Sequence, residues 1–149
     1  VYYLRAQGLS DEEIQAGLTK NGGLQGISGV SSDLRYVLEA AEAGNERAKL
    51  AVDVYVTGIV RYIAAFAAEL GGLDCLAFTG GIGENSDVIR KMVCERLAHM
   101  GIDLSKRRNT KGKGDRRITK KRSRVRVYVI AANEELGVAR KTYACEKNA

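Results

Sequence analysis

Apolar residues recur at helical spacing through the longest regular stretch of this sequence, residues 46–70. Positions three, four and seven apart fall on one face of an α-helix, so the pattern predicts a single long helix. Two consecutive glycines follow it and are expected to end it. The apolar positions of this predicted helix are Leu50, Val54, Ile59, Tyr62, Ile63 and Phe66.

Two shorter helices are predicted before the long one. Ser10 followed by three acidic residues is typical of a helix start, which predicts a helix over residues 11–18. Two serines at positions 31 and 32 can cap a second helix over residues 33–43. The short apolar piece between these helices, residues 24–30, is expected to be extended.

The second half of the chain alternates between strand and helix patterns. Apolar and β-branched runs indicate strands, while Gly101 and Asn133 stand where a helix end and a helix cap are expected. In order, the pattern predicts a strand at 73–79, a helix at 87–99, an irregular charged stretch at 102–121, a strand at 125–131 and a helix at 134–143. Strands that alternate with helices predict an α/β domain.

Length and cysteine usage narrow the class of protein. The 149 residues favour one domain spanning 1–149, and the start at Val1, inside an already patterned segment, leads us to expect a fragment. We expect no membrane span and no signal peptide. Cys75, Cys94 and Cys145 lack metal-ligand spacing and are interpreted as reduced thiols of a cytoplasmic protein, with Cys75 in the core.

The net charge of +6 comes from one segment. Residues 106–126 hold half of the 24 lysines and arginines and one acid, Asp115, so the rest of the chain is mildly acidic. Such a segment can bind nucleic acid or an acidic partner. We favour a solvated loop and strand edge, with no nucleic-acid partner, because no aromatic residue before Tyr128 offers a stacking platform.

A glycine-rich turn, Gly80-Gly81-Ile82-Gly83, lies between the predicted strand at 73–79 and the predicted helix at 87–99. Glycines let the backbone approach a ligand closely, and a helix N-terminus favours negative charge, so the turn is a candidate nucleotide site. Glu84 and Asn85 add groups that can bond a ribose, a base or a water. The alternative is an ordinary tight turn, since neither a Walker loop nor a full dinucleotide fingerprint is present.

Two weaker motifs accompany this turn. Asp33 and Arg35 offer a carboxylate and a guanidinium that can fork onto a phosphate or stack on a base, or they simply pair at a capped helix start. Glu134 and Glu135 follow Asn133 at a predicted strand end. Their carboxylates suit Mg²⁺, although acids are also common in a first helical turn because of the helix dipole.

The three motifs together resemble a known family. SGVSSDLR at 28–35, FTGGIGENS at 78–86 and NEEL at 133–136, in this order, are similar to the acetate/propionate/butyrate kinase family, with the acetate kinases as the best fit. The resemblance implies a sugar-kinase/actin-like ATPase fold, of which this chain is the C-terminal nucleotide-binding domain. It also implies phosphoryl transfer between ATP and acetate, giving acetyl phosphate and ADP, with Mg²⁺ as cofactor and a homodimer as assembly.

The resemblance implies site residues on all three motifs. It also implies that the catalytic residues and the carboxylate site lie in the N-terminal half of the family's enzymes, which this sequence does not contain. The fragment is therefore expected to be inactive alone. Two alternatives stay open: a propionate or butyrate kinase fragment, and a non-catalytic dimerisation or nucleotide-binding module. The implied nucleotide residues are Asp33, Leu34, Arg35, Gly81, Ile82, Gly83, Glu84 and Asn85, and the implied magnesium residue is Glu134.

Overall fold

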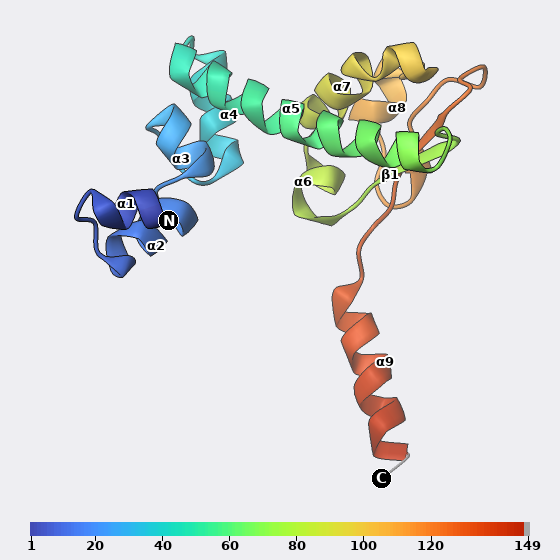
Figure 1. Ribbon diagram of the computed structural model, residues 1–149. Helices are drawn as coiled ribbons and strands as arrows, with labels where there is room; N and C mark the ends of the chain where they lie inside the picture. Colours follow the sequence, from blue (N-terminus) through green and yellow to red (C-terminus); the bar gives the residue numbers. More distant parts are fainter. Residues whose placement is uncertain (148–149) are drawn as a thin grey trace. The chain divides into compact units, whose positions relative to one another are not determined.

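The computed structural model describes residues 1–147, apart from the side chains of Glu134 and Lys147, and shows two compact units (Figure 1). The first unit is Val1–Tyr62 and the second is Ile63–Ala149. The long helix α5, Glu46–Glu69, begins in the first unit and ends in the second, which confirms the helix predicted at 46–70. The expectation of one domain over 1–149 stays a prediction.

The first unit is helical, with α1 at Tyr2–Ala6, α2 at Asp11–Thr19, α3 at Gly23–Ser28 and α4 at Leu34–Glu42. The predicted start of α2 is confirmed. The Ser10 hydroxyl accepts a hydrogen bond from the Glu13 amide at 3.2 Å, and the Glu13 carboxylate accepts one from the Ser10 amide at 2.8 Å. This reciprocal pair satisfies two backbone donors that the first helical turn leaves open.

The extended piece expected at 24–30 is wrong, because α3 occupies most of it. Six residues are too few to display a helical period, so the sequence pattern carried little information there. The Ser28 hydroxyl donates to the Leu24 carbonyl at 2.6 Å, and Gly29, with φ of 69°, ends the helix. The start of α4 also differs in detail, since Asp33 is its cap and accepts from the Arg35 amide at 2.9 Å.

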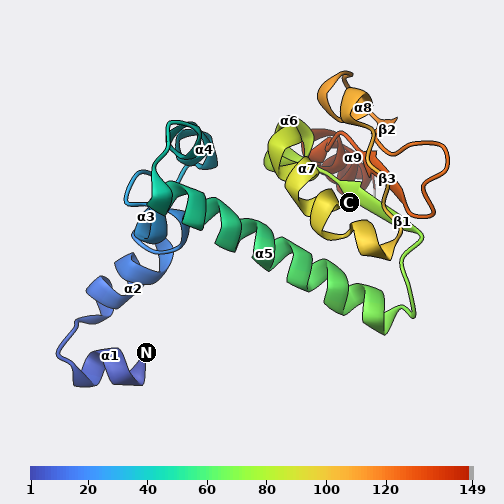
Figure 2. The same ribbon diagram turned by 90° about the horizontal axis from the view of Figure 1, so that it is seen from above.

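The second unit contains a three-stranded sheet with the order β1-β3-β2. Strand β1, Cys75–Phe78, runs parallel to β3, Arg126–Val129, whereas β2, Arg116–Arg117, runs antiparallel to β3. Figure 2 shows this sheet among the helices of the unit. Val127 and Val129 of the central strand are buried, so β3 forms the middle of the core.

The helices of the second unit follow the glycine turn and the strands. They are α6 at Gly80–Asn85, α7 at Asp87–Arg96, the short 3₁₀ helix η1 at Ala98–Met100, α8 at Lys106–Thr110 and α9 at Glu134–Lys147. Gly101, with φ of 100°, ends η1 where a helix stop is predicted, although α7, predicted to run to residue 99, ends at Arg96. The Asn133 side chain accepts from the Leu136 amide at 3.1 Å, which confirms the predicted cap of α9.

The irregular stretch predicted at 102–121 is wrong in part, because it contains α8 and β2. Ile118 and Thr119 in this stretch are fully buried. The Thr119 hydroxyl also accepts a hydrogen bond from the Arg117 guanidinium at 2.9 Å. These two buried residues stand among charged neighbours and are too few to show a periodic pattern, so the sequence does not predict them as core.

The expectation that no segment can span a membrane needs a correction at α5. This helix has 24 residues and a mean hydropathy of 1.6 in its most apolar window, so by length and composition alone it is long and apolar enough to cross a bilayer. Core helices of globular proteins meet the same criterion. Asp53 and Arg61 interrupt the apolar run, so no long uncharged stretch stands out in the sequence. The mean hydropathy of the helix nevertheless stays high.

The three thiols differ in environment. Cys75, expected in the core, is exposed because it opens the edge strand β1, and Cys145 on α9 is exposed as well. Cys94 is buried, and burial raises its pKa to about 12. We expect Cys75 and Cys145 to react with a thiol-specific disulfide reagent in the folded chain, and Cys94 to react only after unfolding. Rapid reaction of all three thiols in native buffer would contradict this placement.

Candidate functional site

The glycine turn is folded into the short helix α6 rather than an open loop. Thr79 precedes it in extended conformation, and Gly80 takes a φ of 71°, which L side chains rarely adopt. A Cβ at Gly83 would lie 3.2 Å from the Phe78 carbonyl carbon, so this glycine lets α6 pack closely on the end of β1. The sequence therefore needs glycines here for backbone geometry as well as for any ligand.

Glu84 joins the glycine turn to the segment that follows β3. Its carboxylate oxygen Oε1 accepts a hydrogen bond from the Gly80 amide at 2.9 Å and another from the Ala132 amide at 2.8 Å. Beside this link lies a cavity of about 360 Å³ that backbone and side chains of both segments line. Its lining residues are Gly80, Gly81, Glu84, Ala132, Asn133 and Glu135. The structure thus brings two of the three sequence motifs together.

Asn85 closes the same short helix on itself. Its side-chain amide donates to the Gly81 carbonyl at 2.8 Å, which fixes the orientation of an exposed side chain. Ile82 is also exposed. A polar amide and an apolar side chain therefore face outward from neighbouring positions of α6, a combination suited to an adenosine that is half polar and half apolar.

Arg90 on α7 holds the glycine turn through hydrogen bonds to its carbonyls. The sequence motifs did not include this residue. The side chain is buried, and each of its three guanidinium nitrogens donates at least one hydrogen bond. Nη1 donates to the carbonyls of Gly83 and Glu84, each at 2.8 Å. Nε donates to the Asn109 side chain at 2.9 Å and Nη2 to the Asn109 carbonyl at 2.8 Å. One cation therefore ties the end of α6 to α8.

A sequence signal for Arg90 was present in the helix period. The buried positions of α7 are Ile89, Arg90, Val93 and Cys94, so the arginine stands on the apolar face of its helix. A charged residue is almost never fully buried unless it is paired, so its place on that face indicates a specific set of partners. Burial lowers the pKa of Arg90, with Arg116 adding to this effect.

The remaining motif, Asp33 to Arg35, lies in the first unit. Leu34 is buried, whereas the Arg35 side chain is exposed and forms an ion pair with Asp33. Hydrogen bonds from the side chain and the amide of Arg35 lower the pKa of Asp33 to about 2. The geometry shows a capped helix start with an intact charge pair, and the convergence of this motif with the other two stays a prediction.

We expect Arg35→Ala to raise the pKa of Asp33 towards its ordinary value, because the larger of the two lowering hydrogen bonds is lost. A folded-state pKa below the unfolded one means that this carboxylate adds stability above about pH 4, and loses it as the pH falls towards 2. A carboxyl-carbon NMR titration measures the shift, with Arg35→Lys as the charge-matched control. An unchanged Asp33 pKa in Arg35→Ala would refute the assignment.

Two acidic residues line the cavity beside Glu84 and are candidate oxygen donors for a metal ion. The side chain of Glu134, the predicted magnesium ligand, lies outside the described residues. Among the described residues no group of three or more His, Cys, Asp or Glu side chains could hold a metal ion. The carboxylates of Glu84 and Glu135 line the cavity, and Mg²⁺ is often held by one or two protein carboxylates together with substrate phosphates. The residues present fit such an ion.

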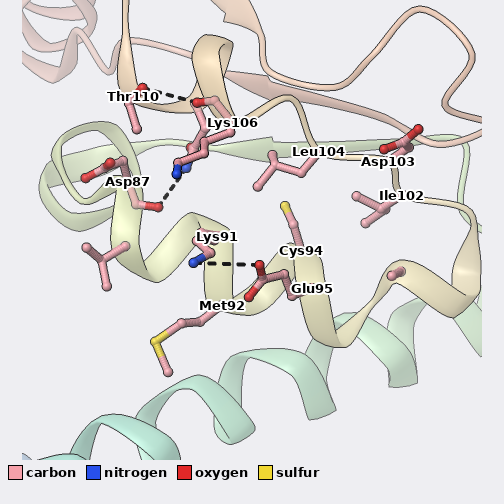
Figure 3. Close-up of a pocket in the computed structure, with 13 residues that line it drawn as sticks. Asp87, Lys91, Met92, Cys94, Glu95, Ile102, Asp103, Leu104, Lys106 and Thr110 are labelled. Atoms are coloured by element: carbon pink, nitrogen blue, oxygen red, sulfur yellow. Dashed lines mark hydrogen bonds and ion pairs between the residues drawn. The ribbon is translucent and has the colours of Figure 1, made fainter.

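A second, larger cavity of about 560 Å³ lies between α7 and α8 and carries none of the motif residues (Figure 3). Apolar groups including Met92, Cys94 and Leu104 line it, and Lys91 and Glu95 form an ion pair of 3.8 Å at its edge. Its chemistry is that of a hydrophobic groove. The cavity beside Glu84 therefore remains the candidate site.

Comparison with known proteins gives the family. The model of the Acetokinase family matches residues 1–140. An acetate kinase of Acholeplasma laidlawii is 48% identical over 134 residues, covering 90% of this chain and 34% of the relative. An acetate kinase of Dictyoglomus thermophilum is 46% identical over 143 residues, covering 95% of this chain and 36% of the relative.

Solved structures agree. The crystal structure of Porphyromonas gingivalis acetate kinase matches with a TM-score of 0.85 at 40% identity, covering 96% of this chain and 36% of that one. A propionate kinase from Francisella tularensis matches with a TM-score of 0.80 at 37% identity, covering 91% of this chain and 34% of that one. The chain spans about a third of the length of these proteins, and its fold is part of the sugar-kinase/actin-like ATPase fold. It belongs to the Acetokinase family.

Proposed function

We propose that this chain supplies the nucleotide-binding part of an enzyme that transfers a phosphoryl group between ATP and acetate, giving acetyl phosphate and ADP. The observation that carries the proposal is the bridge made by Glu84, which holds the glycine turn against the Ala132–Asn133 backbone at 2.9 Å and 2.8 Å. A nucleotide seated in the cavity beside it would lie against backbone on one side and oxygen donors on the other. The names of the relatives supply the substrates.

Each motif has a role in this proposal. Gly81, Ile82, Gly83, Glu84 and Asn85 border the adenosine and its phosphates, while Asp33, Leu34 and Arg35 form the other segment of the nucleotide site. Glu134, followed in the chain by Glu135, would hold Mg²⁺, which would supply positive charge beside the phosphates. Phosphoryl transfer depends mainly on positioning and charge neutralisation. Backbone amides position the nucleotide, and an arginine and a bound cation neutralise its charge.

The acyl acceptor belongs to the rest of the enzyme. We infer that the chain alone is inactive, because none of the motifs described above provides a site for a carboxylate substrate. The propionate kinase of Francisella tularensis has nearly the same fold over this region, so a propionate or butyrate kinase is the alternative within the family. A cytoplasmic location and the lack of a nucleic-acid partner belong to the same proposal.

Dimerisation is a second candidate role, and exposed apolar residues on α5 favour it. Leu50 and Val54 are exposed at its start, and Phe66 is exposed near its end. Side chains of this kind on a long helix are typical of a surface that a partner subunit covers. Light scattering at high concentration tests this role, and a strictly monomeric mass would rule it out.

Nucleotide binding can be measured on the 149-residue chain. Isothermal titration with MgADP is expected to show one site, and Asn85→Ala is expected to weaken it about three- to tenfold, the factor for one lost hydrogen bond. Asn21→Ala is the matched control, since Asn21 is an exposed asparagine of the first unit outside every motif. Equal affinities for the two variants would count against the proposal, and no measurable affinity in any of them would overturn it.

A further inference from the structure

A short basic loop, KGKGDRR at residues 111–117, lies against the glycine turn, and Glu84 of that turn also lines the proposed nucleotide cavity. The two surfaces enclose a cavity of about 210 Å³. Its lining residues are Glu84, Asn85, Gly112, Lys113, Gly114, Arg116, Val129 and Ala131. Because Glu84 lines both cavities, the basic loop faces a direct neighbour of the proposed nucleotide site.

Arg116 gives this cavity an unsatisfied donor. One terminal nitrogen, Nη1, donates to the Gly114 carbonyl at 3.0 Å. The Nε atom is buried and has no hydrogen-bond partner within the described residues. A buried N–H without an acceptor costs free energy, and such groups are rare in native proteins. Arg116 lines the cavity, so an acceptor atom that reached Nε after a small movement of this side chain would remove that cost.

The glycines of the loop make room for this arginine. Gly112 has a φ of 122°, and a Cβ there would lie 2.9 Å from the Arg116 Cδ atom. Gly114 has a φ of 65° and accepts the bond from Nη1 through its carbonyl. Larger residues at these two positions would strain the backbone, so the loop sequence itself holds the arginine against the cavity.

The charge of the cavity favours an anion. Lys113 lines it and forms no ion pair with any described residue. Asp115, the one acid of the loop, accepts from the Ala131 amide at 2.8 Å and does not line the cavity. The Glu84 carboxylate does line it, but its Oε1 already accepts two backbone N–H bonds. Two cations therefore face a single carboxylate that is largely compensated.

We propose that the basic loop and Asn85 form a binding site for a phosphate group, with Lys113 and the Nε of Arg116 as its donors. This proposal rests on the proposed function only for where the bound phosphate comes from. A nucleotide bound at the glycine turn would extend its phosphate past Glu84 into this cavity, whereas a free phosphate ion would enter it alone. Phosphate oxygens are strong acceptors that suit both an ammonium and a guanidinium.

The test is an NMR titration of the ¹⁵N-labelled chain with ADP, adenosine and inorganic phosphate in separate arms. Binding is expected to move the Nε–H signal of Arg116 downfield, because that hydrogen gains an acceptor, and to shift the amides of Gly112 and Gly114. A nucleotide source predicts these shifts with ADP but not with adenosine. A free-ion source predicts them with inorganic phosphate alone.

Variants test the cations directly. Lys113→Ala is expected to lower the affinity for the ligand roughly tenfold, the factor for one charge-assisted hydrogen bond. The ligand is the one whose binding shifts the loop signals. Lys121→Ala removes the same charge from an exposed site outside the cavity and should change affinity less than twofold. Arg116→Lys keeps the charge but lacks Nε, so the Gly112 and Gly114 shifts are expected to shrink.

The outcomes separate this inference from the proposed function. If ADP shifts Gly80 and Gly81 while the loop stays unmoved in the ADP and phosphate arms, the phosphate site is overturned and nucleotide binding stands. If adenosine moves the loop as much as ADP does, the phosphate site is also overturned. If inorganic phosphate moves the loop and ADP binds nowhere, the phosphate site stands and the proposed function fails.

Discussion

Replacing Arg90 with leucine is expected to lower the free energy of unfolding of the second unit by about 3 kcal/mol or more. The substitution removes the donor that serves the carbonyls of Gly83 and Glu84, and it leaves the buried Asn109 without two of its bonds. Leucine fills similar space but satisfies none of these groups. Urea denaturation followed by circular dichroism measures the loss.

The neighbouring cation on α7 provides the control for this prediction. Lys91 is exposed and forms an ion pair of 3.8 Å with Glu95, so Lys91→Leu should change stability by about 0.5 kcal/mol or less. Arg90→Lys is expected to fall between the two, because a single ammonium cannot reach all four acceptors. If Arg90→Leu unfolds at the same urea concentration as the parent chain, Arg90 does not hold α6 in place.

Glu84→Ala is expected to weaken MgADP binding by about ten- to a hundredfold, the factor for losing one or two hydrogen bonds to a charged acceptor. The substitution frees the amides of Gly80 and Ala132 and separates the glycine turn from the segment before α9. Glu84→Gln retains a carbonyl oxygen that can accept both bonds, so we expect it to stay within about threefold of the parent affinity.

The glutamine variant separates two roles for Glu84. If the residue positions the backbone, the amide replaces it well, whereas a role as metal ligand would make Glu84→Gln nearly as weak as Glu84→Ala. Glu95→Ala removes a carboxylate from the exposed side of α7 and serves as the control for lost negative charge. Isothermal titration at fixed Mg²⁺ reports all three variants, and unchanged affinity in Glu84→Ala would contradict the bridge.

Local signals in the sequence predicted much of this fold. The Ser10 cap, the period of α5, the stop at Gly101 and the cap at Asn133 each depend on neighbours within one or two helical turns, and the structure confirms them. The elements that the sequence missed are short. A helix of six residues such as α3 and a strand of two such as β2 form through packing with distant segments, which no local period records.

The candidate site divides in the same way. The glycine turn and the Asn133 segment are recognisable as motifs in the sequence, and their resemblance to the kinase family predicts that they share one site. The bond that joins them runs from Glu84 to Ala132, 48 residues apart, and no local pattern encodes such a contact. Arg90 and Arg116 act through carbonyls and loops that only the folded chain brings close.

The proposed function requires that the glycine turn and the Asn133 segment bind one adenine nucleotide together. Titration of the ¹⁵N-labelled chain with MgADP measures this, because the amides of Gly80, Gly81, Gly83 and Asn133 report on both segments. We predict that all four signals shift along one saturation curve with a single dissociation constant. Shifts confined to other parts of the chain, or separate curves for the two segments, would contradict the proposed function.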